Sequence, residues 1–215
     1  MTSVSILRRG EDISRANVKT IDQMINLVVA VDKKFGIGKQ GTLPWKLKSE
    51  FWYFSNLTKR GFHFIGNEFR LNPDLGNNSV IMGRKTFESI GKRPLKDRRN
   101  IIVSRTEQEI ETASSLKSAI DLNKDANSQI FICGGKRLYE ESISFPCRLF
   151  LTVVDGEYDC DTFFDCSEYL NGKELEITNE IFNELKQKYS VQYSKENGIN
   201  ENGTHYKIYH IEINP

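Results

Sequence analysis

Five short apolar runs recur along the chain, and stretches with helical periodicity separate them. The apolar runs lie at residues 25–32, 79–83, 100–104, 130–133 and 148–154. Continuous runs of this kind, rich in Val and Ile, are typical of strands buried on both faces. Helical patterns lie at residues 46–58, 85–90, 114–122 and 136–143. Strands that alternate with helices predict an α/β fold with a mostly parallel sheet.

The C-terminal part of the chain has a different pattern. Residues 188–194 and 205–213 alternate between polar and apolar side chains, as strands with one solvated face do. Residues 195–204 between them contain two Asn-Gly pairs, which favour tight turns. The pattern predicts one long antiparallel hairpin at the end of the sheet, with residues 195–204 as its loop.

No internal repeat or low-complexity linker divides the chain, so we expect one domain at residues 25–215. Residues 1–24 are polar and lack a clear period, which indicates an N-terminal extension outside the fold. Residues 58–79 are rich in Gly, Asn and aromatic side chains and are long for a connection. We expect this segment to be either a functional loop or an insertion with its own packing.

Composition excludes several classes of protein. The 30 Lys and Arg residues against 29 Asp and Glu give a net charge of +1, which argues against a globally basic nucleic-acid binder. No apolar stretch is long enough to span a membrane, and the start lacks the apolar core of a secretory signal. The four cysteines lack metal-ligand spacing. We therefore expect a cytoplasmic chain with reduced thiols, without metal, membrane or nucleic-acid partners.

A glycine pattern at residues 36–41, GIGKQG, matches the GxGxxG dinucleotide fingerprint. That fingerprint requires a helix that opens at the glycines, and Pro44 delays the helix here. The next predicted strand also begins some forty residues later, too far for the unit. We therefore interpret the glycines as a loop that approaches a ligand closely, with an ordinary Gly-rich turn as the alternative.

The predicted helix after Pro44 carries one carboxylate within an apolar face. The positions that share this face are Leu47, Glu50, Phe51, Phe54 and Leu57. We expect the face to point at the sheet. Burial raises the pKa of a carboxyl group, which suits a group that handles protons near neutral pH. The alternative is a surface Glu50 paired with Lys46.

Basic residues and glycines follow three of the predicted strands. Arg84 and Arg105 each follow one strand, and Gly134, Gly135 and Lys136 follow another. Ligands of open α/β sheets bind beyond the carboxyl ends of the strands. Arg binds phosphate through paired donors, and a Gly pair lets the backbone approach a pyrophosphate. The pattern favours a phosphorylated cofactor, and basic residues on a solvated surface are the alternative.

Six blocks, taken in order, resemble dihydrofolate reductase. They are GIGKQGTLPWKLKSEFWYF, VIMGRKTFESI, RPLKDR, IIVSR, FICGGKRLY and DTFF. The resemblance is to eukaryotic, fungal-like members and runs from about residue 25 to the C-terminus. It implies a single α/β domain with an eight-stranded mixed sheet flanked by helices. It also implies a monomer that reduces 7,8-dihydrofolate to tetrahydrofolate with NADPH for one-carbon metabolism and thymidylate synthesis, and that binds antifolate inhibitors.

The resemblance assigns roles around the substrate. Glu50 matches the family's acidic residue, which binds the pterin and promotes protonation of N5 after hydride transfer to C6. Trp45 matches a Trp that holds a water near this acid, and Leu43 lies in the loop that closes over nicotinamide. Thr162 matches the Thr that supports the acid. The other substrate positions, which end at the Arg for the glutamate tail, are Val28, Val29, Phe51, Phe54, Ile90, Leu95, Cys133, Tyr139 and Arg98.

The resemblance also assigns a cofactor site. Arg84, Ser104 and Arg105 match the site of the 2′-phosphate, so NADPH is favoured over NADH. Gly134 and Gly135 match a pair that is usually joined by a cis peptide. The other cofactor positions are Ala30, Ile37, Gly41, Gly83, Lys85, Thr86, Cys133, Lys136, Arg137 and Leu138. Cys133 replaces a common Ile or Val, and a neutral thiol is a small apolar group of similar size.

Three alternatives remain open at this point. The chain could be a non-catalytic relative that binds folate or nucleotide without turnover, although an intact Glu50 argues against this. It could be a reductase of the riboflavin pathway, which would not need Glu50, Trp45 and Arg98 together with Thr162. It could also be the reductase part of a fusion with thymidylate synthase.

Overall fold

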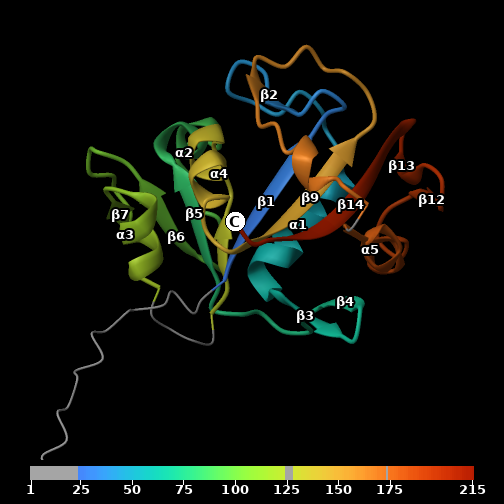
Figure 1. Ribbon diagram of the computed structural model, residues 1–215, viewed down its shortest axis with the longest axis horizontal. Helices are drawn as coiled ribbons and strands as arrows, with labels where there is room; N and C mark the ends of the chain where they lie inside the picture. The colour runs from blue at the N-terminus through green and yellow to red at the C-terminus, as the bar shows by residue number, and fades with distance from the viewer. Residues whose placement is uncertain (1–23, 124–127, 173) are drawn as a thin grey trace, which may run out of the picture.

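The computed structural model describes residues 24–123, 128–172 and 174–215 (Figure 1). The expected N-terminal extension, residues 1–24, lies outside these residues except for Met24. No helix in the described ranges is long and apolar enough to cross a membrane.

A central sheet organises the described residues. Its strand order is β12-β13-β14-β9-β1-β8-β5-β6-β7, and β11 pairs with β14. The predicted parallel strands are present as β1 (Ile25–Val31), β5 (Ser79–Gly83), β6 (Arg99–Val103), β8 (Ile130–Ile132) and β9 (Cys147–Val154). All pairs that these five strands make with one another are parallel, which confirms the predicted α/β fold with a mostly parallel sheet.

The sheet has ten described strands rather than the eight that the resemblance implied. The additional strands include short pieces at its margin, β7 (Thr112–Ala113) and β11 (Leu175–Glu176). Two residues are too few to show an alternation of polar and apolar side chains. Such strands arise only where the neighbouring backbone offers hydrogen bonds, so the sequence pattern does not reveal them.

Antiparallel strands end the sheet, which confirms the predicted C-terminal hairpin, and only its expected loop differs. The segment expected to be its loop contains a strand, β13 (Gly198–Glu201), between β12 (Gln192–Ser194) and β14 (Thr204–Ile213). Two tight antiparallel hairpins therefore replace one long hairpin. Gly198 has φ 74°, and a Cβ there would overlap the carbonyl oxygen of Tyr206. Only glycine fits where this turn meets β14.

Helices cover both faces of the sheet. The structure contains α1 (Lys48–Arg60), α2 (Arg84–Ser89), α3 (Leu116–Asp121), α4 (Lys136–Ser142) and α5 (Thr178–Leu185). The first four confirm the predicted helices, with boundaries that differ by at most two residues. Helix α5 was not predicted from the sequence. Its signal was the buried stripe Ile177, Ile181 and Leu185, which has the spacing of one helix face.

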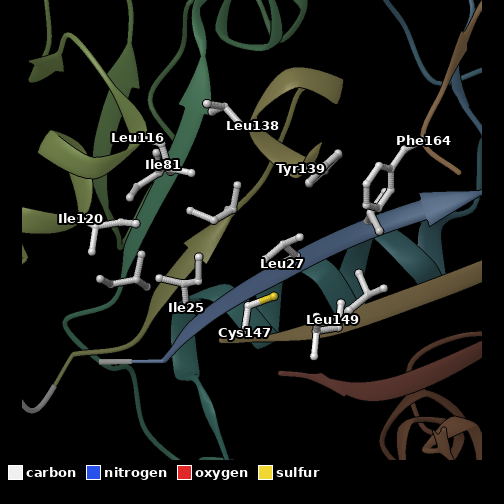
Figure 2. Close-up of a cluster of buried hydrophobic side chains, with 14 of the residues drawn as sticks. Ile25, Leu27, Ile81, Leu116, Ile120, Leu138, Tyr139, Cys147, Leu149 and Phe164 are labelled. Carbon is white, nitrogen blue, oxygen red and sulfur yellow. The ribbon is translucent and has the colours of Figure 1, made fainter. Parts of the chain in front are cut away.

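Two apolar clusters hold these layers together. Along β1, Leu27 and Val29 belong to one cluster and Val28 to the other. Figure 2 shows the cluster on the side of α3 and α4, where Leu116 and Leu138 lie over the sheet. The other cluster contains residues of α1 and α5. Because β1 is covered on both faces, its sequence is continuously apolar.

The expected insertion at residues 58–79 has its own packing. It contains the antiparallel hairpin of β3 (Phe62–Ile65) and β4 (Glu68–Leu71). The Phe62 ring packs edge-on against Phe150 of β9, with centroids 4.7 Å apart. Figure 1 shows this hairpin at the opposite end of the molecule from β2 (Gly36–Gly38). Of the two alternatives, the structure therefore favours a packed insertion over a functional loop.

Candidate active site

A cavity of about 1010 Å³ lies at the carboxyl ends of β1, β5, β6 and β8. All of the predicted substrate and cofactor residues line it except Trp45 and Arg98. Strands from distant parts of the sequence end at this edge, which explains why blocks spread over more than 130 residues meet in one place. Six further lining residues were not predicted from the sequence, which are Gly38, Thr42, Met82, Ser89, Val103 and Thr106.

Glu50 is the acidic residue of the cavity and lies in the first turn of α1. Its side chain is buried, with 8% of the residue exposed. Burial raises the pKa of Glu50 to about 7, a hydrogen bond from Thr152 lowers it, and the charge of Glu201 raises it. This confirms the expected buried carboxyl group, and the alternative of a surface ion pair with Lys46 is wrong.

The predicted sheet-facing side of α1 is wrong at Phe51. The buried residues of α1 are Ser49, Glu50, Tyr53, Leu57 and Thr58, whereas Phe51 is 61% exposed. The helix is rotated so that the hydroxyl of Ser49 lies within hydrogen-bonding distance of Tyr206 of β14, at 2.6 Å. Phe51 consequently lines the cavity instead of packing on the sheet, whereas Phe54 lines the cavity and also packs against the apolar cluster of α1 and α5.

Thr162 does not support the acid, which corrects the role expected from the resemblance. The Thr162 hydroxyl donates to Asp161, 2.9 Å away. The hydroxyl that donates to Glu50 belongs to Thr152 of β9, with 3.4 Å between Oγ1 and Oε1. Thr152 faces α1 because alternate residues of β9 point to that side of the sheet. Its signal in the sequence was a lone hydroxyl in the apolar run at 148–154.

Trp45 is not among the residues that line the cavity. It is 6% exposed and packs edge-on against Tyr158, with ring centroids 5.3 Å apart. Its indole Nε1 is buried and has no hydrogen-bond partner among the described residues. A buried N–H group of this kind costs free energy unless it finds an acceptor. Trp45, three residues before α1, therefore offers a free hydrogen-bond donor.

The Gly-rich segment contributes Ile37, Gly38 and Gly41 to the lining of the cavity. Gly36 to Gly38 form β2, which pairs with β10 (Thr162–Phe163). The Gln40 N–H donates to Asp161 Oδ2 at 2.7 Å, and Leu43, which also lines the cavity, is 52% exposed. The close approach at Gly36 is to Cys160 rather than to a ligand, because a Cβ on Gly36 would overlap the Cys160 side chain.

Basic side chains collect at one end of the cavity. Arg84, Lys85, Arg105, Lys136 and Arg137 are all exposed there. Arg84 forms an ion pair with Glu88 and Lys136 with Glu140, at 2.6 Å and 3.6 Å. Arg105 has no carboxylate partner in the described part of the chain. This end of the cavity can therefore attract phosphate groups.

Two neighbouring glycines line the basic end of the cavity. The peptide between Gly134 and Gly135 is cis, as the resemblance implied. A Cβ on either residue would lie 3.2 Å from Thr86 Oγ1, so side chains would fill the space that these glycines leave. Next to them, burial raises the pKa of the Cys133 thiol to about 12, so it is a neutral, apolar part of the wall.

Arg98 lies outside the main cavity and borders a smaller one. It is half-buried, and its guanidinium donates to Thr58 Oγ1 at 2.7 Å. Leu95, three residues earlier, lines the main cavity. The described residues contain no group of three or more His, Cys, Asp or Glu side chains that could hold a metal ion.

Comparison with known proteins identifies the family. The family model described as dihydrofolate reductase matches residues 24–197. The chain belongs to the dihydrofolate reductase family. It is 38% identical to the Schistosoma mansoni dihydrofolate reductase over 167 residues, which cover 71% of this chain and 84% of that protein. It is 41% identical to the Drosophila melanogaster dihydrofolate reductase over 151 residues, which cover 65% and 78%.

A solved structure supports the same family and the predicted fold. The Schistosoma mansoni dihydrofolate reductase aligns with a TM-score of 0.61 and 30% identity, covering 89% of this chain and 99% of that chain. The protein is therefore an enzyme of the dihydrofolate reductase family, whose reaction converts dihydrofolate to tetrahydrofolate. The riboflavin-pathway alternative is set aside.

Proposed function

We propose that this dihydrofolate reductase uses NADPH and that Glu50 is its catalytic acid. The observation that carries the proposal is a single buried carboxyl group in a cavity that has a basic end. With a pKa of about 7, Glu50 can both hold a proton and release it at neutral pH. The reaction adds a hydride at pterin C6 and a proton at N5.

The cavity residues fit NADPH. Arg105, Arg84 and Ser104 would hold the 2′-phosphate, and Gly134 and Gly135 leave room for a group that approaches the backbone. The cofactor, when bound, supplies the hydride. Leu43 and the segment around it would cover the nicotinamide and exclude water.

The other end of the cavity fits a pterin with an aromatic tail. The Glu50 carboxyl group would bind the pterin amino group and N3, and would promote protonation of N5 through a water that the Trp45 N–H orients. Val28, Phe54 and the neutral Cys133 provide apolar surface for the ring. Leu95 and Ile90 would contact the aminobenzoyl part, and Arg98 the carboxylate of the tail.

The test is the loss of NADPH absorbance on addition of dihydrofolate. We expect turnover that depends on both compounds. NADPH binding without turnover would contradict the proposal and favour a non-catalytic folate- or nucleotide-binding relative. A monomer, a cytoplasmic location, antifolate binding and the absence of nucleic-acid partners stay predictions.

Replacing Thr152 with Val is expected to change how Glu50 titrates. The Thr152 hydroxyl lowers the pKa of Glu50, so its loss should move the midpoint of the pH–activity profile upward. Loss of one hydrogen bond to a charged form should also lower kcat/KM for dihydrofolate by about tenfold. Thr162→Val is the matched control and should leave the midpoint in place. A shift in Thr162→Val alone would reverse the assignment of the two threonines.

A further inference from the structure

The first turn of α1, which carries Glu50, lacks a cap from its own sequence. The residue before the helix is Leu47, whose side chain cannot accept a hydrogen bond. The first N–H groups of a helix have no partner within the helix, and they carry the positive end of its dipole. A buried helix start of this kind requires an acceptor from elsewhere in the fold.

Glu201 supplies that acceptor from the end of β13. Its two carboxylate oxygens accept hydrogen bonds from the N–H groups of Lys48 and Ser49, each at 2.9 Å. The Ser49 hydroxyl also donates to Glu201 and lies 2.6 Å from the hydroxyl of Tyr206. Glu201 is only 6% exposed, so this network is buried. It joins the terminal hairpin to the helix turn that holds Glu50.

The same contacts place a negative charge beside Glu50. Glu201 binds the N–H group of the residue that immediately precedes Glu50. Its charge offsets the positive end of the helix dipole, which would otherwise favour ionised Glu50. The titratable or polar groups that face Glu50 from the surrounding elements are Tyr53, Thr152, Tyr139, Tyr206 and Glu201. Among these groups, Glu201 carries the negative charge.

We propose that Glu201 is a positioning residue for the reaction, which holds the first turn of α1 and favours the protonated form of Glu50 through its charge. The inference rests on the proposed role of Glu50. It predicts two separable effects. Loss of the charge changes the pH at which Glu50 titrates, and loss of the hydrogen bonds changes how well Glu50 binds dihydrofolate.

Glu201→Gln separates the charge from the shape of the side chain. We expect the midpoint of the pH–kcat profile to fall by about 0.5 to 1 unit, because a like charge no longer opposes ionisation of Glu50. We also expect KM for dihydrofolate to rise severalfold while KM for NADPH stays the same. Glu212→Gln is the matched control, because Glu212 also lies on the terminal strands but pairs with Arg148 on the surface.

Glu201→Asp keeps the charge and withdraws it by one methylene group. KM for dihydrofolate should rise in this variant, while the pH midpoint should move less than in Glu201→Gln. If Glu201→Gln does not fold, Glu201→Asp still tests the proposal. Wild-type values of both KM for dihydrofolate and the pH midpoint in Glu201→Asp would overturn it. Lower thermal stability of Glu201→Gln with an unchanged midpoint would mean a purely structural role, which also overturns it.

The proposed function and this inference fail differently. Full activity in Glu50→Gln would remove the role of Glu50 and the inference together. An inactive Glu50→Gln with a wild-type profile in Glu201→Gln would overturn only the role of Glu201.

Discussion

Glu50→Gln is expected to lower kcat at pH 7 by at least about 100-fold, the contribution typical of a positioned acid. The amide has nearly the same shape but cannot hold a transferable proton. Activity should partly recover at acidic pH, where the substrate can be protonated from solvent. Steady-state kinetics between pH 5 and 9 would measure both effects. An unchanged pH profile would show that another group supplies the proton.

The same variant has a stability signature that separates lost chemistry from misfolding. The folded pKa of Glu50 is about 7, against an ordinary value of 4.5. Because this pKa is raised, the folded state is favoured below pH 4.5 and loses that advantage as the pH rises through 7. Glu50→Gln should therefore be more stable than wild type at pH 8, on the order of 1–3 kcal/mol, and about equally stable at pH 4. Equal thermal shifts at both pH values would contradict the raised pKa.

Arg105→Ala is expected to raise KM for NADPH by roughly 30-fold, the size of a lost charge-assisted hydrogen bond. KM for NADH should change little, because NADH lacks the 2′-phosphate. Arg105 should matter more than Arg84, whose guanidinium is shared with Glu88. The effect should shrink at high salt, since Arg105 is exposed.

The control for Arg105→Ala is Arg70→Ala. Arg70 is also partly exposed but lies on the β3–β4 hairpin, where it pairs with Glu68. It does not line the cavity, so KM for both nucleotides should stay at the wild-type value. Equal losses of NADPH and NADH binding in Arg105→Ala would refute the assignment of the 2′-phosphate site.

Continuous apolar runs were sufficient to predict the five central strands. A strand covered by helices on both faces must be apolar at nearly every position, and β1 shows this in its alternation between two clusters. The strands β11 and β13 escaped prediction because short segments pair according to what lies beside them. Helix α5 was different, since its stripe of Ile177, Ile181 and Leu185 was visible in the sequence and was overlooked.

For the site, the sequence determined which side chains are present. Its order of strands and helices also determined that these side chains would meet at one edge of the sheet, where β1, β5, β6 and β8 end. It also marked Glu50 as the one carboxylate within the apolar face of its helix. Only the tertiary structure decided how α1 is rotated, so that Phe51 faces the cavity and Ser49 faces β14. It also decided that Thr152, rather than Thr162, bonds to Glu50, and that Glu201 caps the helix from 152 residues away. These contacts join residues far apart in sequence, and local periodicity carries no information about which distant strand a helix face will meet.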